Sequence, residues 1–245
     1  MKGSLNKSQV DRFSRQLVIK NIGAKGQKKI LSSKILVVGI GGLGCPAAES
    51  LVRAGVGTIG LIDNDIVNLS NIHRQSLFNS NDLKKLKVSV AAKKLKDINP
   101  LVKIKTYKLR LNKSNIKNII RNYEVVIDGS DNFETKFLIN DYCIKQKKKL
   151  ITGAISKFDG HIFTFDFKDK KTASLKNFYQ ENEISDDILN CEFEGVIGTT
   201  ASIVGTTQAN EALKMIMEIG QNLKNQILII DLLNLNFRKI KFKKI

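Results

Sequence analysis

A glycine-rich turn that follows a short apolar run is the feature that most constrains how this chain can fold. Residues 34–39 read KILVVG, and Gly39, Gly41 and Gly44 have the spacing G-x-G-x-x-G. Asp63 stands at the end of the next apolar run, TIGLID. Such glycines let the backbone approach phosphate closely, and the carboxylate can accept hydrogen bonds from ribose hydroxyls. The pattern predicts a strand, turn and helix that hold a nucleotide; glycines that only packed the helix on the sheet would leave Asp63 unexplained.

Apolar runs and helical periodicities alternate along most of the chain. This alternation is typical of an α/β fold, and we expect a Rossmann-like, mostly parallel sheet with helices on both faces and an antiparallel C-terminal extension. We expect a single domain with an N-terminal arm (1–33), a nucleotide-binding core (34–155) and a C-terminal part (156–245). Residues 168–194 show no pattern, which is typical of a functional or mobile loop. The expected strands are 34–39, 58–63, 102–111, 124–131, 149–155, 161–167, 227–234 and 237–245, and the expected helices are 45–56, 83–99, 112–122, 132–146 and 199–219.

The composition narrows the class of protein. The formal net charge is +18, but lysines are spread over every segment and form no stripe interleaved with aromatic residues, which disfavours nucleic-acid binding. The first residues lack the apolar stretch of a signal peptide, and no run approaches the roughly 20 apolar residues that span a bilayer, so we expect a cytoplasmic protein without a membrane partner. The three cysteines form no C-x-x-C pair, which excludes a disulfide framework and a four-thiolate zinc site.

The glycine spacing alone does not separate NAD, FAD or SAM from ATP, but the next segments favour ATP. Arg74, within the run SNIHRQ, and Lys87 place two positive charges near the ends of the same strands. Two cations suit a triphosphate whose leaving pyrophosphate must be neutralised. Asp131 ends a strand at the same edge and can bind Mg²⁺, although it can also cap the helix that follows.

These segments together resemble the ThiF/MoeB/HesA family, relatives of the ubiquitin-activating enzymes. The similarity covers residues 11–242, and its motifs are specific only in combination. The motifs are Arg12-Phe-Ser-Arg15-Gln16, the turn GIGGLG, Asp63-Asn-Asp65, the run SNIHRQ, Lys87 and the DGSDN of residues 128–132.

The resemblance implies an adenylyltransferase that uses ATP and Mg²⁺ to activate the C-terminal glycine carboxylate of a ubiquitin-like, β-grasp sulfur-carrier protein ending in Gly-Gly. A carboxylate is a poor electrophile, and joining it to AMP creates a mixed anhydride with a good leaving group. The enzyme need only align the ionised carboxylate with the α-phosphorus, so no general base is required. The implied pathway is sulfur transfer to thiamin thiazole or to molybdopterin, and the C-terminal part of the chain would bind the carrier.

The resemblance also implies roles for individual residues. Arg15 reaches into the ATP site of a second subunit, which implies a homodimer with shared sites, although a surface salt bridge is the alternative. Asp131 holds the metal, and Cys191 forms a covalent link to the carrier in some relatives, although Glu192 and Glu194 beside it would raise the pKa of its thiol. The implied catalytic residues are Arg15, Arg74, Lys87 and Cys191. The implied nucleotide-binding residues are Gly39, Gly41, Gly42, Gly44, Asp63, Asp65, Ser70, Asn71, Arg74, Lys87 and Asp131.

This sequence also departs from the family pattern. The two C-x-x-C pairs that bind a structural zinc in many members are missing from these residues. We therefore expect no zinc, no rhodanese-like extension and a separate sulfur donor. Cys45 and Cys143 are expected to be buried apolar residues. His73 is expected to pack or hydrogen-bond, and His161 to be a strand-end residue. We expect neither Arg74 nor Lys87 to sit in the core.

Alternative functions remain open on the sequence. The chain can be an adenylating enzyme for another substrate, such as a tRNA-modification intermediate or a peptide C-terminus, or an ATP-binding scaffold without turnover. The scaffold alternative is disfavoured because the chain retains residues expected to act on ATP, namely Arg15, Asp63, Arg74, Lys87 and Asp131. A nicotinamide oxidoreductase would need a second substrate domain, and the two cations would then have no role.

Overall fold

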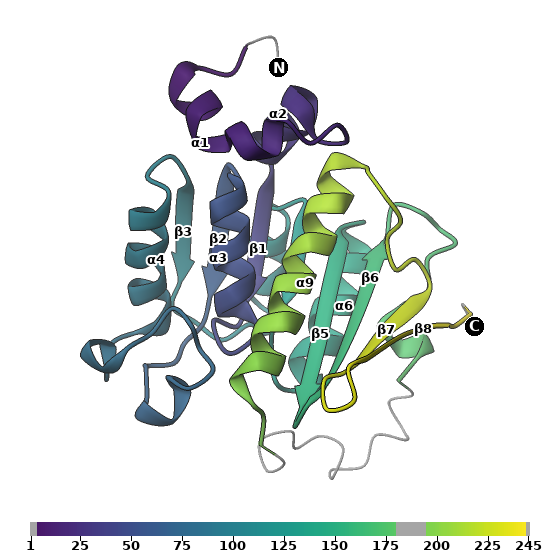
Figure 1. Ribbon diagram of the computed structural model, residues 1–245. Coiled ribbons are helices and arrows are strands. Elements are labelled where there is room, and N and C mark those ends of the chain that lie inside the picture. Colours follow the sequence, from purple (N-terminus) through teal and green to yellow (C-terminus); the bar gives the residue numbers. More distant parts are fainter. Residues whose placement is uncertain (1–3, 180–194, 244–245) are drawn as a thin grey trace.

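The computed structural model describes residues 4–179 and 195–243, which form one eight-stranded sheet flanked by helices (Figure 1). The strand order is β3-β2-β1-β4-β5-β6-β7-β8. The first five strands in this order run parallel, and the last three join antiparallel. The expected mostly parallel sheet with an antiparallel C-terminal extension is therefore confirmed. The strands are β1 (Lys34–Val38), β2 (Thr58–Ile62), β3 (Lys103–Tyr107), β4 (Val125–Asp128), β5 (Lys149–Ser156), β6 (Asp159–Asp166), β7 (Gln226–Asp231) and β8 (Asn236–Lys241).

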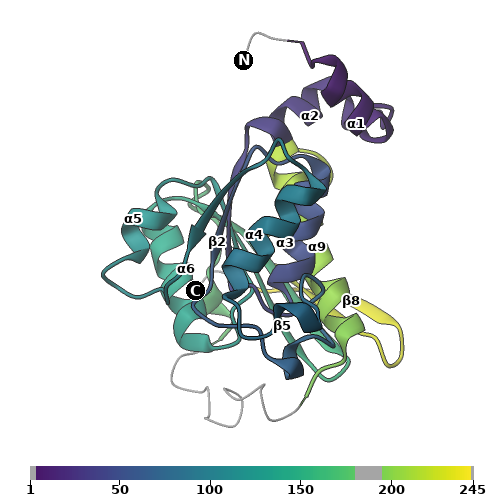
Figure 2. The ribbon, with the colours of Figure 1, turned by 90° about the vertical axis from the view of Figure 1, so that its left-hand side faces the viewer.

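Helices cover both faces of the sheet, with α3, α4 and α9 on one side and α5 and α6 on the other (Figure 2). The alternation of side chains along β1 explains the two cores. Ile35 and Val37 pack into the cluster beneath α3, α4 and α9, whereas Leu36 and Val38 join the cluster beneath α5 and α6. The helices are α1 (Lys7–Leu17), α2 (Gly23–Ser32), α3 (Gly44–Ala54), α4 (Lys87–Ile98), α5 (Ile116–Ile120), α6 (Phe133–Lys145) and α9 (Gly198–Met217).

Several element boundaries differ from the sequence-based expectation. Helix α4 begins at Lys87, not at residue 83, because Lys84 has φ +63° and the segment around it hydrogen-bonds back to Val67. Strand β4 ends at Asp128, not at residue 131, because the next residues turn back toward the Asp128 carboxylate, which accepts from the Ser130 N–H and Oγ.

The N-terminal arm contains two helices that lie at the end of the sheet where the parallel strands begin (Figure 1). Helix α1 starts at a capping box between Asn6 and Gln9. Its Phe13 is fully buried against Gly55, where φ is +94° and an added Cβ would come within 2.4 Å of the Phe13 ring. The arm is thus anchored on the C-terminus of α3 rather than free.

The C-terminal part contains two hairpins, β5–β6 and β7–β8, and α9 lies between them along the chain. Strands β5 and β6 pair from Ser156–Asp159 outward and form a hairpin with its turn at Lys157 and Phe158. Within residues 168–179 of the patternless segment, Leu175 is buried in the cluster beneath α6. In the described parts of the chain, no helix has the length and apolarity that crossing a membrane requires.

Candidate active site

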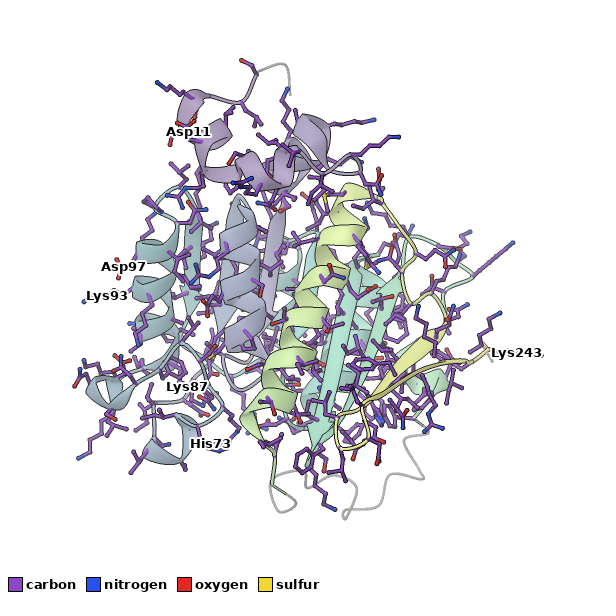
Figure 3. The ribbon with its side chains drawn as sticks, viewed as in Figure 1. Asp11, His73, Lys87, Lys93, Asp97 and Lys243 are labelled. Carbon is purple, nitrogen blue, oxygen red and sulfur yellow. The ribbon has the colours of Figure 1, made fainter. Side chains whose placement is uncertain are left out.

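A cavity of about 1110 Å³ opens where β1, β2 and β4 end. Figure 3 labels His73 and Lys87 at this end of the molecule, opposite Asp11 of α1. Strands β2 and β4 flank β1 on opposite sides, and the helices that follow β1 and β4 lie on opposite faces of the sheet. Ligands of open α/β sheets bind at such a switch point, outside the carboxyl ends of the strands.

The glycine turn forms the floor of this cavity. Gly39 has φ +79°, and a Cβ added there would lie 2.9 Å from the Gly129 carbonyl oxygen. A Cβ on Gly44 would lie 1.8 Å from the Gly39 carbonyl oxygen, whereas one on Gly41 would meet nothing closer than Gln75 Nε2 at 3.8 Å. Gly39 and Gly44 therefore shape the turn, and Gly41 and Gly42 line the cavity, with open space beside Gly41.

Asp63 is held in place by the turn that it faces. Its Oδ2 accepts a hydrogen bond from the Ile40 N–H at 2.7 Å, and its Oδ1 accepts from the Asp65 N–H at 2.8 Å. Each carboxylate oxygen keeps further lone pairs. Asp63 is thus fixed beside the glycine turn with acceptor capacity left for ribose hydroxyls.

The side chain of Lys87 is more buried than the sequence predicts. It is only 6% exposed, and its Nζ lies 3.0 Å from Asp65 Oδ2. The expectation that Lys87 lies outside the core is wrong, because the residue begins α4 and its N–H donates to the Asp65 carbonyl in the cavity wall. Both Lys87 and Asp65 nevertheless line the cavity, so the ammonium group can act on a bound ligand.

The run SNIHRQ contributes to the cavity only in part. Arg74 and His73 line it, and Arg74 Nη1 donates to the Ser70 carbonyl at 2.9 Å and lies 2.8 Å from His73 Nε2. The expected hydrogen-bonding role of His73 is therefore confirmed. Ser70 and Asn71 are not among the cavity-lining residues. Asn71 instead uses its side-chain oxygen to accept from the Asn68 N–H.

Asp131 also lines the cavity, beside the end of β4. Asp131 does not cap the helix that follows it. Asn132 is the N-cap of α6, and its side chain accepts a hydrogen bond from the Thr135 N–H at 2.9 Å. Among the described residues, no group of three or more His, Cys, Asp or Glu side chains is arranged to hold a metal. A single carboxylate still fits Mg²⁺, which proteins often hold through one or two carboxylates together with substrate phosphates. The expected absence of zinc stays a prediction from the cysteine spacing.

A buried polar network beside Asp131 was not anticipated. The Asp128 carboxylate is fully buried and accepts from Lys136 Nζ at 3.2 Å and from Thr152 Oγ1. Lys136 also donates to the Gly153 carbonyl at 2.7 Å and lines the cavity. Asp128 could have been predicted from the sequence, because it comes at the end of an apolar run as Asp63 does. The periodicity of the helix did not indicate that Lys136 is buried.

Two further cavity residues were also missed. Gln75 is 3% exposed, and its Oε1 has no hydrogen-bond partner in the described parts of the chain. His161 lies within β6 rather than simply at a strand end, and it lines the cavity. Burial lowers the pKa of His161 and outweighs the opposing charge of Asp159, so its imidazole is neutral at neutral pH.

The remaining expected site residues lie elsewhere. Arg15 is an exposed residue of α1, which lies at the end of the sheet opposite the cavity (Figure 1), and it is not among the cavity-lining residues. Cys191 lies outside the described residues. Cys45 and Cys143 are fully buried, as expected, and burial raises the pKa of Cys45 to about 12 and that of Cys143 further.

Comparison with known proteins places this geometry in a family. The sequence model of the ThiF family matches residues 13–244. A sulfur carrier protein adenylyltransferase of Thermus thermophilus is 36% identical over 97% of this chain and 89% of its own length. A probable molybdopterin-synthase adenylyltransferase of Gracilaria tenuistipitata is 38% identical over 97% of this chain and 66% of its own. The probable adenylyltransferase/sulfurtransferase MoeZ of Mycobacterium tuberculosis is 35% identical, and the match spans 62% of its length.

Solved structures agree on the fold. A crystal structure of E. coli MccB with ATP has a TM-score of 0.84 at 20% identity and covers 99% of this chain and 73% of that chain. The structure of PaaA has a TM-score of 0.83 at 20% identity and covers 100% of this chain and 77% of that chain. The family match over nearly the whole chain, together with relatives that are themselves adenylyltransferases, shows that this protein belongs to the ThiF family and is an adenylyltransferase.

Proposed function

We propose that the protein uses ATP to adenylate the C-terminal glycine carboxylate of a ubiquitin-like sulfur-carrier protein in the cytoplasm. The carrier is ThiS-like or MoaD-like, and the pathway leads to thiamin or molybdopterin. The observation that supports this most is the meeting of Lys87, Arg74, Asp131 and the open backbone at Gly41 in one cavity. Relatives named for the same activity on sulfur carriers support the choice of substrate.

The residues of the cavity account for the step. A carboxylate oxygen of the carrier attacks the α-phosphorus, the bond from that phosphorus to the bridging oxygen breaks, and pyrophosphate leaves with the electron pair. The Lys87 ammonium and the Arg74 guanidinium neutralise the charge that builds on the pyrophosphate. Asp63 holds the ribose, and the main chain at Gly41 and Gly42 lets the phosphates approach.

Asp131 is the residue that would hold Mg²⁺, which supplies charge neutralisation to the triphosphate when bound. One carboxylate can suffice, because proteins often hold Mg²⁺ through one or two carboxylates together with substrate phosphates. Its neighbour Asn132 orients it, since Asn132 Nδ2 donates to Asp131 Oδ1 at 3.2 Å.

We also propose a homodimer whose two active sites are shared. Arg15 is an exposed residue of the anchored helix α1, which lies at the opposite end of the sheet from the cavity of its own chain (Figure 1), and this suits a residue that completes the site of a second copy. The sulfur donor is a separate protein.

The decisive measurement is ATP–pyrophosphate exchange by the purified protein with Mg²⁺, adding in turn each small Gly-Gly-ending β-grasp protein of the same genome. We expect exchange that depends on one such carrier, which also identifies the pathway. ATP binding without exchange for any carrier would contradict the proposal and favour another acyl substrate or a scaffold.

A further inference from the structure

The ion pair in the cavity wall joins two side chains of very unequal exposure. The side chain of Lys87 is 8% exposed and that of Asp65 is 59% exposed, and Lys87 Nζ lies 3.0 Å from Asp65 Oδ2. Among the described residues, Asp65 is the one carboxylate that forms an ion pair with this ammonium group. A buried charge needs an opposite charge close by, because burial removes the water that would otherwise stabilise it. Asp65 therefore compensates the charge of Lys87 before any phosphate binds.

The main chain of Asp65 is held by bonds that do not involve its carboxylate. Its N–H donates to Asp63 Oδ1 at 2.8 Å, and its carbonyl accepts from the Lys87 N–H at 2.9 Å. Asn64 Nδ2 lies 3.5 Å from Asp65 Oδ1, and Oδ2 faces Lys87. The charge of Asp65 can therefore be removed without loss of the hydrogen bonds that fix its backbone.

Asp65 places a negative charge where the proposed reaction brings phosphates. It lines the cavity together with Lys87 and Arg74. A phosphate that contacts the Lys87 ammonium also comes close to the Asp65 carboxylate, because that carboxylate is 3.0 Å from the same nitrogen. Like charges at such separations repel, so Asp65 weakens the binding of ATP and of pyrophosphate. Weaker binding of a product favours its release, which limits the turnover of many enzymes.

We propose that Asp65 is a positioning residue that shares Lys87 with the phosphates and thereby promotes the release of pyrophosphate, an inference that rests on the proposed cleavage of ATP. The ammonium group has three N–H donors, so it can keep one on Asp65 Oδ2 while another reaches a phosphate oxygen. As pyrophosphate leaves, Asp65 again compensates the whole charge of Lys87. The competition between this carboxylate and the product keeps the affinity for pyrophosphate low.

The test is Asp65→Asn, which removes the charge and keeps the size of the side chain. We expect the Kd for pyrophosphate with Mg²⁺, measured by titration calorimetry, to fall on the order of tenfold. Asp97→Asn is the matched control, because Asp97 is an exposed acid near the other end of α4 (Figure 3). It removes the same charge about 15 Å along the helix from Lys87. The Kd for pyrophosphate of Asp97→Asn should stay within about twofold of the wild type.

A double-mutant cycle tests whether Asp65 acts through Lys87. In the Lys87→Ala background, the gain in pyrophosphate affinity from Asp65→Asn should shrink to about twofold or less. The reason is that Asp65 is largely exposed, so water screens its direct repulsion of the product. An undiminished gain in this background would show that Asp65 acts on pyrophosphate directly, and would overturn the positioning role.

Exchange kinetics separate this role from a purely structural one. In carrier-dependent ATP–pyrophosphate exchange by Asp65→Asn, the KM for pyrophosphate should fall on the order of tenfold. The KM for the carrier should stay within about twofold of the wild type. Unchanged or weaker pyrophosphate binding by Asp65→Asn, with its fold checked by circular dichroism, would overturn the inference.

The two proposals fail in different ways. Pyrophosphate binding is measured without a carrier, so it reports on Asp65 even if no carrier supports exchange. Wild-type protein that binds pyrophosphate but exchanges with no carrier would contradict the proposed function alone. Wild-type protein that binds neither ATP nor pyrophosphate would overturn both.

Discussion

Gly41 and Gly44 belong to the same turn but leave very different room for a side chain. A Cβ on Gly44 would overlap the Gly39 carbonyl at 1.8 Å, whereas one on Gly41 would lie 3.8 Å from its nearest neighbour. We expect Gly44→Ala to cost at least about 2 kcal/mol in the free energy of unfolding. Gly41→Ala should change that free energy by no more than about 0.5 kcal/mol and still weaken ATP binding, because its methyl group occupies the path of the phosphates.

Urea unfolding followed by circular dichroism and ATP titration calorimetry separate the two effects. A stable Gly44→Ala protein with ordinary ATP affinity would contradict the shaping role assigned to that glycine. An undiminished ATP affinity in Gly41→Ala would show that the phosphates pass elsewhere.

Lys87 is the buried cation on which the proposed chemistry most depends. Its partner Asp65 is largely exposed, so Lys87→Ala leaves no carboxylate stranded in the core. We expect exchange to fall about 100-fold or more, by analogy with the loss of one charge-stabilising donor, while the protein remains folded. Lys93→Ala, an exposed lysine on the same helix, is the matched control and should exchange at the wild-type rate. Full activity in folded Lys87→Ala would remove Lys87 from the catalytic assignment.

Residue identities were easier to predict from the sequence than residue positions. Asp63 and the glycines were found because their roles follow from spacing along the chain. Lys136 and Gln75 were not, because their burial follows from tertiary contacts: Lys136 binds Asp128 and the Gly153 carbonyl, and Gln75 lies close to Gly41. Ser70 and Asn71 were assigned to the nucleotide with the whole run, yet local turn bonds draw Asn71 away from the cavity.

At the scale of elements, alternating patterns gave the order and type of nearly every strand and helix, and tertiary contacts shifted their ends. Strand β3 stops at Tyr107, whose carbonyl accepts from the Asp63 N–H. Helix α4 begins at Lys87 because the residues before it hydrogen-bond back to Val67. The periodicity of the sequence did not predict the helices of the N-terminal arm, because most of their residues are polar and only a few, such as Phe13, are buried. Sequence patterns therefore predicted the edge of the sheet at which the cavity opens, but they did not predict all the residues that line it.

Three elements meet at the buried pair of Asp128 and Lys136, which joins the ends of β4 and β5 to α6. Removing one partner leaves the other charge buried and uncompensated. We expect Lys136→Met to lower the free energy of unfolding by about 3–5 kcal/mol, measured by urea denaturation. The double variant Asp128→Asn with Lys136→Met should recover part of that loss, because no lone charge remains. Equal stability of the single and double variants would show that the pair acts only by packing.

At the scale of the whole molecule, the distance between Arg15 and the cavity makes the proposed dimer testable. Arg15→Ala and Lys87→Ala should each be inactive alone. When the two variants are co-expressed and assemble at random, half of the dimers contain one subunit of each variant. Each of these mixed dimers has one complete site of its two, so about a quarter of the wild-type exchange activity should return. A mixture of Arg15→Ala with the Arg15→Ala, Lys87→Ala double variant is the control. No recovery in the first mixture would show that Arg15 does not act in trans.

The burial of Cys45 and Cys143 has a practical consequence for labelling chemistry. Both thiols are sealed inside the cores with strongly raised pKa values, so neither is a thiolate at neutral pH. The chain has three cysteines, so any maleimide taken up by the native protein reports, by elimination, on Cys191. A fluorescent tag or cross-link found on a cysteine of the native protein would therefore be assigned to that position, and its protection by a carrier would be measured without a contribution from the other two cysteines.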